Sequence, residues 1–222
     1  MASNPIIRLV GLSKSYPSPT GAIVVLDGLD LTIGAGEKVS LVGPSGSGKS
    51  TLLSLIAGLL RPDSGSVQID GTTLADLDDT DRAQLRAHRI GIALQSDNLI
   101  PFLSARENVQ LAMGFASSRQ PTSSRADALL EQMGVAHRRN HLPRQLSGGE
   151  AQRVSLGVAL ANEPAVLLAD EMAAQLDSAT AAQVTDAIFA SHMAVLFVTH
   201  DFDLADRAER RLALADHKLV TR

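Results

Sequence analysis

The chain contains the stretch Gly43-Pro44-Ser45-Gly46-Ser47-Gly48-Lys49-Ser50-Thr51, which fits the phosphate-loop pattern G-x-x-x-x-G-K-[ST] at every position. The apolar-leaning residues 38–42 before it predict a buried strand, and the apolar spacing over 52–60 predicts a helix after it. Glycines let backbone N–H groups turn toward a polyphosphate, and the helix N-terminus adds partial positive charge. We therefore expect a phosphate site in which the Lys49 ammonium and the loop amides dominate, with the Ser50 hydroxyl placed to bind Mg²⁺.

The composition allows one sizeable domain with room for a subdomain, because the chain has 222 residues of which 45% are hydrophobic. Cysteine is absent, which excludes disulfides, thiolate metal sites and a cysteine nucleophile. The first residues do not resemble a signal peptide, and no stretch reaches the roughly 18–20 apolar residues of a membrane helix. We expect a soluble chain that would need a separate subunit to work in a membrane.

The charge balance argues against nucleic-acid binding. The net charge is −4 and aromatic residues make up 3% of the chain, whereas such binding usually shows a basic footprint and stacking side chains. The one dense basic patch, His137-Arg138-Arg139, fits a solvated loop better than a phosphate track.

The N-terminal part predicts strands around the phosphate loop. Residues 6–12 and 22–33 are predicted strands, joined by a Pro/Ser/Gly-rich loop over 17–21, and 61–71 predict a turn, a strand and a turn. A helix over 78–88 and a strand over 90–94 follow. Tyr16 is equally consistent with stacking on a purine base or with packing on the core. Gln95 is a polar strand terminus unless it reaches the Mg²⁺ at Ser50.

The segment from Ser96 to about Ala161 changes to helices and loops. Ser104 and Glu107 have the spacing of a capping box, which predicts a helix start, and residues 124–134 predict another helix. The apolar residues 99–103 ahead of Ser104 fit a partner surface and a small satellite core about equally.

A second glycine motif occurs within this helical segment, at Leu146-Ser147-Gly148-Gly149-Glu150-Ala151-Gln152-Arg153. Ser147 and Glu150 again have capping-box spacing, so the motif is explained as a well-capped helix start. It also fits a second anion site, in which the Ser147 hydroxyl and the amides of Gly148 and Gly149 bind a phosphate.

Two apolar strands deliver polar residues at their C-terminal ends, where ligands bind in open α/β sheets. Residues 165–169 lead to Asp170 and Glu171, and residues 194–199 lead to His200. Asp170 could hold Mg²⁺, and Glu171 could orient and deprotonate water; solvated loop acids are the alternative. His200 could reach a γ-phosphate, although a lone histidine at a strand end is more often structural.

Together these motifs resemble the nucleotide-binding subunit of ABC transporters over essentially the whole chain. In that family Gly43–Thr51 is the Walker A motif, Gln95 the Q-loop and Leu146–Arg153 the signature. Val166–Asp170 with Glu171 is Walker B, and His200 is the switch histidine. Tyr16 matches the aromatic residue that stacks on adenine.

The resemblance implies an α/β P-loop NTPase fold, with a RecA-like mixed sheet core, an antiparallel β subdomain and an inserted helical subdomain. The core would comprise residues 1–95 and 162–222, and the helical signature subdomain 96–161. ATP and Mg²⁺ are the implied cofactors, with Mg²⁺ held by Ser50, Gln95 and Asp170. A head-to-tail homodimer would clasp ATP between Walker A of one subunit and Ser147–Gly149 of the other.

Catalysis in this family implies that Glu171 activates water, Lys49 neutralises developing charge and His200 contacts the γ-phosphate. One departure concerns the D-loop. The related group continues with Pro-Thr-Gly-Asn-Leu-Asp, whereas this chain reads Met172-Ala173-Ala174-Gln175-Leu176-Asp177. Leu176 and Asp177 are retained but the proline and glycine are not, so altered communication between the two sites, or an altered rate, is expected. The acids Asp170 and Glu171 are intact, so an inactive site is not expected.

Residues 98–109 resemble the lipoprotein-release and macrolide-exporter group. This resemblance implies a peripheral ATPase on the cytoplasmic face of the cell membrane, with a permease contacting Gln95–Val109. The expected function is export or lipoprotein extraction. The alternative is an ATPase that mechanically regulates a membrane protein controlling cell-wall enzymes, without transport.

Overall fold

The computed structural model describes residues 5–19, 21–93, 99–116 and 122–221, and the predicted Q-loop residue Gln95 lies outside them. Two compact units make up the chain: Met1–Ala83 with His192–Arg222, and Gln84–Ser191. The second unit is a continuous stretch inserted between the two parts of the first.

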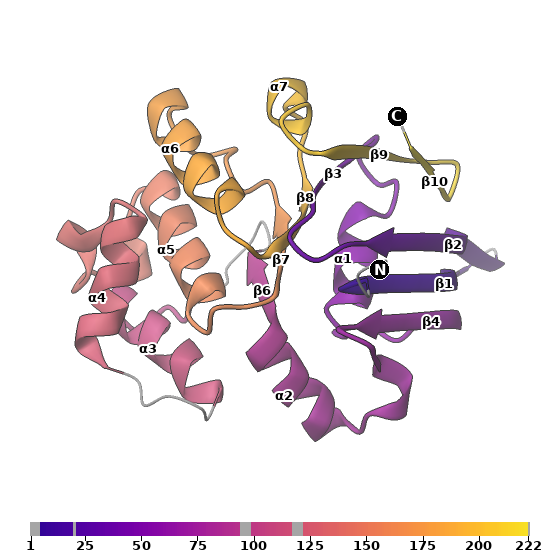
Figure 1. The fold of residues 1–222 in the computed structure, drawn as a ribbon, viewed down its shortest axis with the longest axis horizontal. Helices are drawn as coiled ribbons and strands as arrows, with labels where there is room; N and C mark the ends of the chain where they lie inside the picture. The colour runs from indigo at the N-terminus through magenta and orange to yellow at the C-terminus, as the bar shows by residue number, and fades with distance from the viewer. Residues whose placement is uncertain (1–4, 20, 94–98, 117–121, 222) are drawn as a thin grey trace. The chain divides into compact units, whose positions relative to one another are not determined.

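The first unit contains an antiparallel sheet of β1 (Ile7–Ser18), β2 (Gly21–Ile33), β4 (Ser64–Ile69) and β5 (Thr72–Thr73), in the order β2-β1-β4-β5 (Figure 1). Ile7 pairs with Ile33 on one side and with Ile69 on the other. The first strand continues to Ser18, well past the predicted end at residue 12. Pairing with β2 through Ser18↔Gly21 extends it, because it provides backbone hydrogen bonds that apolar spacing does not reveal.

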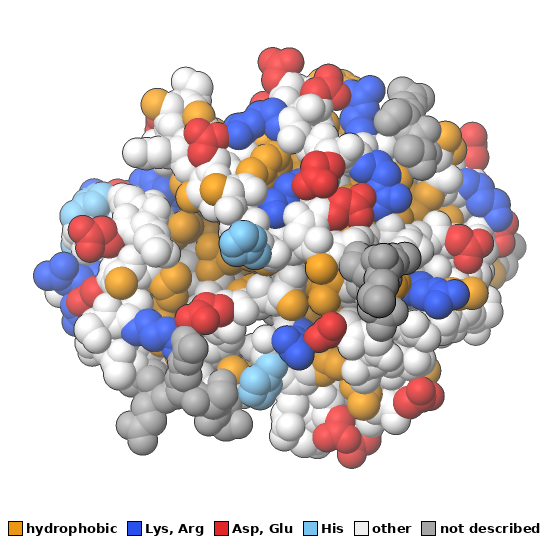
Figure 2. All heavy atoms as spheres, viewed as in Figure 1, with side chains coloured by type: hydrophobic (Ala, Val, Ile, Leu, Met, Phe, Trp, Pro, Cys, Tyr) orange, Lys and Arg blue, Asp and Glu red, His pale blue; other side chains and the backbone are white. Residues whose placement is uncertain are grey.

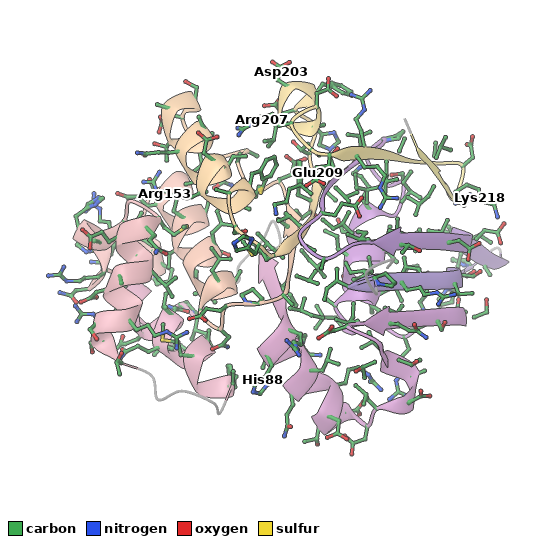
Figure 3. All side chains as sticks on the ribbon, in the orientation of Figure 1. His88, Arg153, Asp203, Arg207, Glu209 and Lys218 are labelled. Atoms are coloured by element: carbon green, nitrogen blue, oxygen red, sulfur yellow. The ribbon has the colours of Figure 1, made fainter. Side chains whose placement is uncertain are left out.

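A parallel arrangement surrounds the phosphate-loop strand. In the first unit, β3 (Lys38–Val42) pairs on its two sides with β8 (Ala194–Val198) and β9 (Arg210–Ala215), and β10 (Lys218–Thr221) pairs antiparallel with β9. All residues of β3 and β8 are buried, as expected of parallel strands covered on both faces. The hairpin formed by β9 and β10 was not predicted from the sequence; Figure 3 labels Lys218, the first residue of β10.

Helix α1 (Lys49–Ile56) begins inside the phosphate loop and ends earlier than the apolar spacing predicted. Gly58 takes a φ of 66°, a left-handed conformation that stops the helix, so Leu59 and Leu60 lie beyond it. A short 3₁₀ turn, η1 (Leu74–Asp76), and the four-residue α7 (Phe202–Ala205) complete the first unit.

The second unit pairs two parallel strands with a group of helices. Helix α2 (Asp79–Arg89) connects the units and leads into β6 (Ile90–Ala93), which pairs with β7 (Val166–Asp170). Helices α3 (Ala105–Phe115), α4 (Ser123–Gln132) and α5 (Gly148–Leu160) pack against one another (Figure 1). Two 3₁₀ turns, η2 (Ala136–Arg138) and η3 (Pro143–Gln145), precede α5, and α6 (Ser178–Phe189) follows β7.

These elements confirm the predicted α/β class and its antiparallel β and helical parts. The finer prediction, a core of 1–95 and 162–222 with a helical subdomain of 96–161, stays a prediction. Across the described residues, no helix has the length and hydropathy of a membrane span. Acidic and basic side chains are interspersed over the face shown in Figure 2.

Candidate functional site

The phosphate loop is shaped by glycines that no other residue could replace without strain. Gly43 follows β3 with a φ of 155°, and a Cβ at that position would lie 2.4 Å from the backbone oxygen of Leu214. Gly48 has a φ of 102°, and its Cβ would lie 2.6 Å from Cγ1 of Val25. The loop therefore runs against neighbouring backbone and side chains where only glycine fits.

Lys49 turns back over the loop that precedes it. The residue is 7% exposed, and its Nζ donates to the carbonyl oxygens of Gly43 and Pro44, at 2.8 Å each. Gly48 is the N-cap of α1 and brings no side chain to cap the first-turn amides. The ammonium and the helix N-terminus thus converge on one loop, the arrangement that binds phosphate in such sites.

Other loop residues take distinct positions. Ser47 donates its amide to the Pro44 carbonyl at 3.2 Å, and its buried Oγ has no hydrogen-bond partner in the described part of the chain. Ser50 is exposed and Thr51 is half-buried in the first turn of α1. Ser50 thus offers an oxygen donor at the surface of the helix start.

Tyr16 lies on β1 opposite Ile23 and is 37% exposed. Nζ of Lys14 lies 5.8 Å from the centre of its ring, within the range of a cation–π interaction. This exposure does not fit the core-packing alternative, and base stacking stays a prediction.

Strand β7 places Asp170, the predicted Mg²⁺ ligand, and the following Glu171, the predicted base, in a buried setting of the second unit. All its residues are buried, and Asp170 at its end is 6% exposed. Glu171 follows with a φ of 58°, and its Oε1 is buried. Nε2 of Gln152, on α5, donates to the Glu171 carbonyl at 3.4 Å, which ties the signature helix to the turn that carries the acid.

The signature begins α5 with the predicted capping box. The Ser147 amide donates to Glu150 Oε2 at 2.8 Å, and the Glu150 amide donates to Ser147 Oγ at 3.2 Å. The amides of Gly148 and Gly149 have no hydrogen-bond acceptor among the described residues. The helix start is therefore capped, and two of its amides stay available to an anion.

Glu150 is also paired beyond its own helix. Its Oε1 accepts a hydrogen bond from Arg138 Nε at 2.8 Å and lies 3.4 Å from Nε2 of His137. The Ser147 amide and then the Arg138 guanidinium lower the pKa of Glu150 from 4.5 to about 2. Sequence reasoning missed this role of Arg138, which was assigned to a solvated loop. The only sequence signal is a basic residue twelve positions before the glutamate of a capping box.

The D-loop segment lies against the signature glycines. A Cβ on Gly148 would lie 2.6 Å from Gln175 Oε1, and a Cβ on Gly149 would lie 2.6 Å from the Gln175 backbone oxygen. Asp177 caps α6 by accepting the Thr180 amide at 3.0 Å, and this hydrogen bond lowers the pKa of Asp177. The unusual Met172–Gln175 sequence thus forms a turn in contact with the signature of the same chain.

His200 is exposed two residues after the end of β8, in the first unit. The next residue, Asp201, caps α7 by accepting the amides of Asp203 and Leu204, at 2.9 and 3.1 Å. Figure 3 labels Asp203 within this helix and Arg207 just beyond its end. The local fold therefore places His200 at a strand end without burying it.

The predicted site residues fall into two groups. Tyr16, Gly43–Thr51 and His200 belong to the first unit, and Ser147–Gly149, Asp170, Glu171 and Asp177 belong to the second. Within the second unit, Gln152 and Gln175 link the signature to the acids and to the D-loop, and neither was predicted as a site residue. Their positions depend on how helix, strand and turn meet, which motif spacing does not report.

Comparisons with known proteins agree with these motifs. The family model described as ABC transporter matches residues 26–174. The chain is 42% identical to the lipoprotein-releasing system ATP-binding protein LolD 2 of Caulobacter vibrioides, over 98% of this chain and 97% of that protein. It is also 42% identical to the macrolide export ATP-binding/permease protein MacB 2 of Aeromonas hydrophila, over 98% of this chain but 34% of that longer protein.

A solved structure gives the same answer. The ATP-binding cassette MJ0796, in a dimeric post-hydrolysis state bound to ADP and Pi, superimposes with a TM-score of 0.93. The two chains are 37% identical, and the match covers 97% of each. The phosphate loop, the strand-end acids and the glycine signature thus occur in a chain that belongs to the ABC transporter family, as one of its ATP-binding and ATP-hydrolysing subunits.

Proposed function

We propose that this ATPase works as a head-to-tail homodimer on the cytoplasmic face of the cell membrane, where it drives a separate permease that extracts lipoproteins or exports amphiphilic compounds. The observation that carries the nucleotide site is Lys49, whose ammonium is turned onto the carbonyls of the loop at Gly43 and Pro44. A triphosphate can replace these carbonyls with stronger, charged acceptors.

Each residue of the loop has a role in this proposal. The amides of Gly43–Thr51 and the Lys49 ammonium hold the phosphates, and the exposed ring of Tyr16 stacks on adenine. Hydrogen bonds to charged groups contribute roughly 1.5–3 kcal/mol each, whereas a helix dipole contributes about 0.3–1 kcal/mol. The amides and the ammonium should therefore dominate binding.

Ser50, Gln95 and Asp170 would hold Mg²⁺. They offer hydroxyl, amide and carboxylate oxygens, the hard donors that Mg²⁺ prefers. Asp170 is 6% exposed, and a carboxylate so buried favours a cationic partner. When bound, the ion supplies charge neutralisation at the β- and γ-phosphates.

Glu171 would accept a proton from the water that attacks the γ-phosphorus. A general base must be oriented, and the turn that carries Glu171 is tied to α5 through Gln152. His200 would contact the γ-phosphate, and Lys49 would stabilise the charge that develops on its oxygens.

The dimer follows from the open amides of the signature. Gly148 and Gly149 have no acceptor within the described part of their own chain, and Ser147–Gly149 would contact the nucleotide bound by the other subunit. Asp177 would lie near the same nucleotide. The dimeric state of the MJ0796 cassette supports this arrangement.

The permease would contact residues 95–109, of which 95–98 lie outside the described residues. Phe102 is 75% exposed, an unusual position for a large apolar side chain, and it suits an apolar contact with a membrane subunit. The names of the relatives, lipoprotein release and macrolide export, support a substrate with a lipid or amphiphilic part. They favour transport over the mechanical-regulation alternative.

The test begins with gentle isolation of the complex from native membranes and identification of the membrane protein that accompanies it. Phe102→Asp should lower recovery of that protein and permease-stimulated ATP turnover by about tenfold or more, because a charge would be placed in an apolar contact. Val220→Asp, at an apolar residue of β10 that is 52% exposed, is the matched control. A Phe102→Asp variant that recovers the permease as the wild type does would remove this residue from the interface.

A further inference from the structure

The carboxylate of Glu150, which caps α5, lies where a negative charge would weaken the binding of an anionic nucleotide. Glu150 occupies the first turn of α5, next to the open amides of Gly148 and Gly149. In the proposed dimer, on which this inference rests, those amides face the triphosphate bound by the second subunit. A carboxylate there stabilises its own helix, yet it repels the nucleotide and offsets part of the positive potential of the helix N-terminus.

The carboxylate is fully engaged. Glu150 Oε2 accepts from the Ser147 amide at 2.8 Å, and Oε1 accepts from Arg138 Nε at 2.8 Å. The Glu150 side chain is 12% exposed, so solvent screens its charge little, and the contact with Arg138 is close. With its pKa lowered to about 2, Glu150 is ionised at any physiological pH. Its charge is therefore permanent and has to be balanced by a neighbour.

We propose that Arg138 is a positioning residue for ATP: it balances the charge of Glu150 and holds that carboxylate in the capping position, so that the start of α5 attracts the nucleotide of the second subunit. This role is separate from direct contact with the nucleotide. It explains how the chain can use glutamate to cap the helix at an anion site.

The neighbours of Arg138 do not share its position. Arg139 is exposed, and it contacts the rest of the unit through its backbone: its carbonyl accepts a hydrogen bond from the Arg106 amide at 2.9 Å. His137 lies 3.4 Å from Glu150 Oε1, with 60% of its side chain exposed. Of these three basic residues, Arg138 makes the short contact. Arg139→Gln therefore removes the same formal charge without removing the ion pair.

The experiment compares Arg138→Gln with Arg139→Gln in the full-length chain, or in its complex with the permease. The KM for ATP should rise about three- to tenfold in Arg138→Gln, with a smaller change in kcat, and should move little in Arg139→Gln. Raising the salt from about 0.05 to 0.5 M should shrink the defect, because it shortens the Debye length to a few ångströms. A misplaced helix would not be repaired by salt.

Rescue separates charge balance from scaffolding. Glutamine also completes a capping box, so Glu150→Gln removes the charge while keeping the cap. In the double variant with Glu150→Gln, Arg138→Gln should no longer raise the KM, and Arg138→Lys alone should keep most of the wild-type affinity. An equal rise in KM in the double variant, or equal effects of Arg138→Gln and Arg139→Gln, would overturn the proposal.

The outcomes distinguish failure of the role proposed for Arg138 from failure of the proposed function on which it rests. If the wild-type chain neither hydrolyses ATP nor dimerises with it, the proposed function fails. If the wild type does both and Arg138→Gln behaves like Arg139→Gln, only the role of Arg138 fails. Should Arg138→Gln unfold, the Arg138→Lys variant and the double variant still decide the matter, since each keeps the local charge balanced.

Discussion

Helices α3 and α5 begin with the same local chemistry and differ in their surroundings. Each has a serine N-cap and a glutamate three residues later. The cap amide donates to the glutamate at 2.7 Å for Ser104 and 2.8 Å for Ser147. The return hydrogen bonds, at 3.3 and 3.2 Å, are equally alike. The two helix starts are thus closely similar by internal geometry.

The first-turn amides of α3 and α5 differ in their hydrogen bonding. In α3 the amide of Ala105 donates to the His141 carbonyl, and that of Arg106 donates to the Arg139 carbonyl, at 2.9 Å each. In α5 the corresponding amides, of Gly148 and Gly149, find no acceptor in the described part of the chain. One helix start is closed by the chain itself, and the other is left open for an anion.

A single short segment, residues 137–141, produces both outcomes. Its carbonyls close α3, and its Arg138 side chain pairs with the capping glutamate of α5. At α3 the adjacent Arg106 pairs instead with Asp127, at 2.7 Å. The comparison teaches that a capping box specifies where a helix begins, while the surrounding segment determines whether that beginning can bind a ligand.

The largest effect should come from a variant that traps the ATP-bound dimer. In that state the amides at the start of α5 should be bound to nucleotide, whereas those at the start of α3 should be unchanged. Glu171→Gln should cut ATP turnover by roughly 10²–10⁴, the usual range for a general base, and should accumulate an ATP-bound dimer. Hydrogen exchange should then slow at Gly148 and Gly149 and stay unchanged at Ala105 and Arg106. Phosphate release, sedimentation and exchange measure these three effects.

Glu163→Gln is the matched control for that variant, because Glu163 also has a positive φ, of 51°, and pairs instead with Arg125 at 3.2 Å. Near-normal turnover in Glu171→Gln would refute its assignment as the base. Equal slowing of hydrogen exchange at the starts of α3 and α5 would contradict the prediction that only α5 binds an anion there.

A smaller effect should separate the two caps. Ser104→Ala and Ser147→Ala should each lower the free energy of unfolding by about 1 kcal/mol, which is roughly 2–4 °C in Tm for a chain of this size. Only Ser147→Ala should also raise the KM for ATP. Thermal unfolding and steady-state kinetics on the two variants check this, and an equal change in KM would contradict it.

The smallest effect should be on the free energy of unfolding at acidic pH. The pKa of Glu150 is lowered from 4.5 to about 2, so its carboxylate stabilises the fold fully above about pH 4.5 and loses that effect as the pH falls toward 2. Glu150→Gln should therefore be less stable than wild type at pH 7, with the gap closing on acidification. The pKa of Glu107 is lowered by Ser104, so Glu107→Gln should show the same sign.

Denaturant titrations of wild type, Glu150→Gln and Glu107→Gln at neutral and acidic pH measure how much the free energy of unfolding of each variant differs from that of wild type. A difference for Glu150→Gln that stays constant down to pH 2 would show that the ionised form of Glu150 adds no stability. The outcome for Glu107 then serves as the reference for a cap without an arginine partner.

Several features could be predicted because their causes lie within a few residues of one another. Ser104 with Glu107, and Ser147 with Glu150, predicted both helix starts, and the structure confirms them. The strand leading to Asp170 was predicted from a run of apolar residues, and β7 is buried throughout. Other features were missed for the opposite reason: the extension of β1 to Ser18 depends on its pairing with β2.

The amino-acid sequence by itself determined the phosphate loop, the two capped helices and the acids at the strand end, since glycine conformations, three-residue hydrogen bonds and apolar runs are local. Only the tertiary structure decided that Arg138 meets Glu150, that Gln175 lies on the signature glycines, and that carbonyls of 139 and 141 close α3 but not α5. These contacts join segments separated along the chain. Their existence depends on how the helices pack, and no spacing of residues in the sequence encodes it directly.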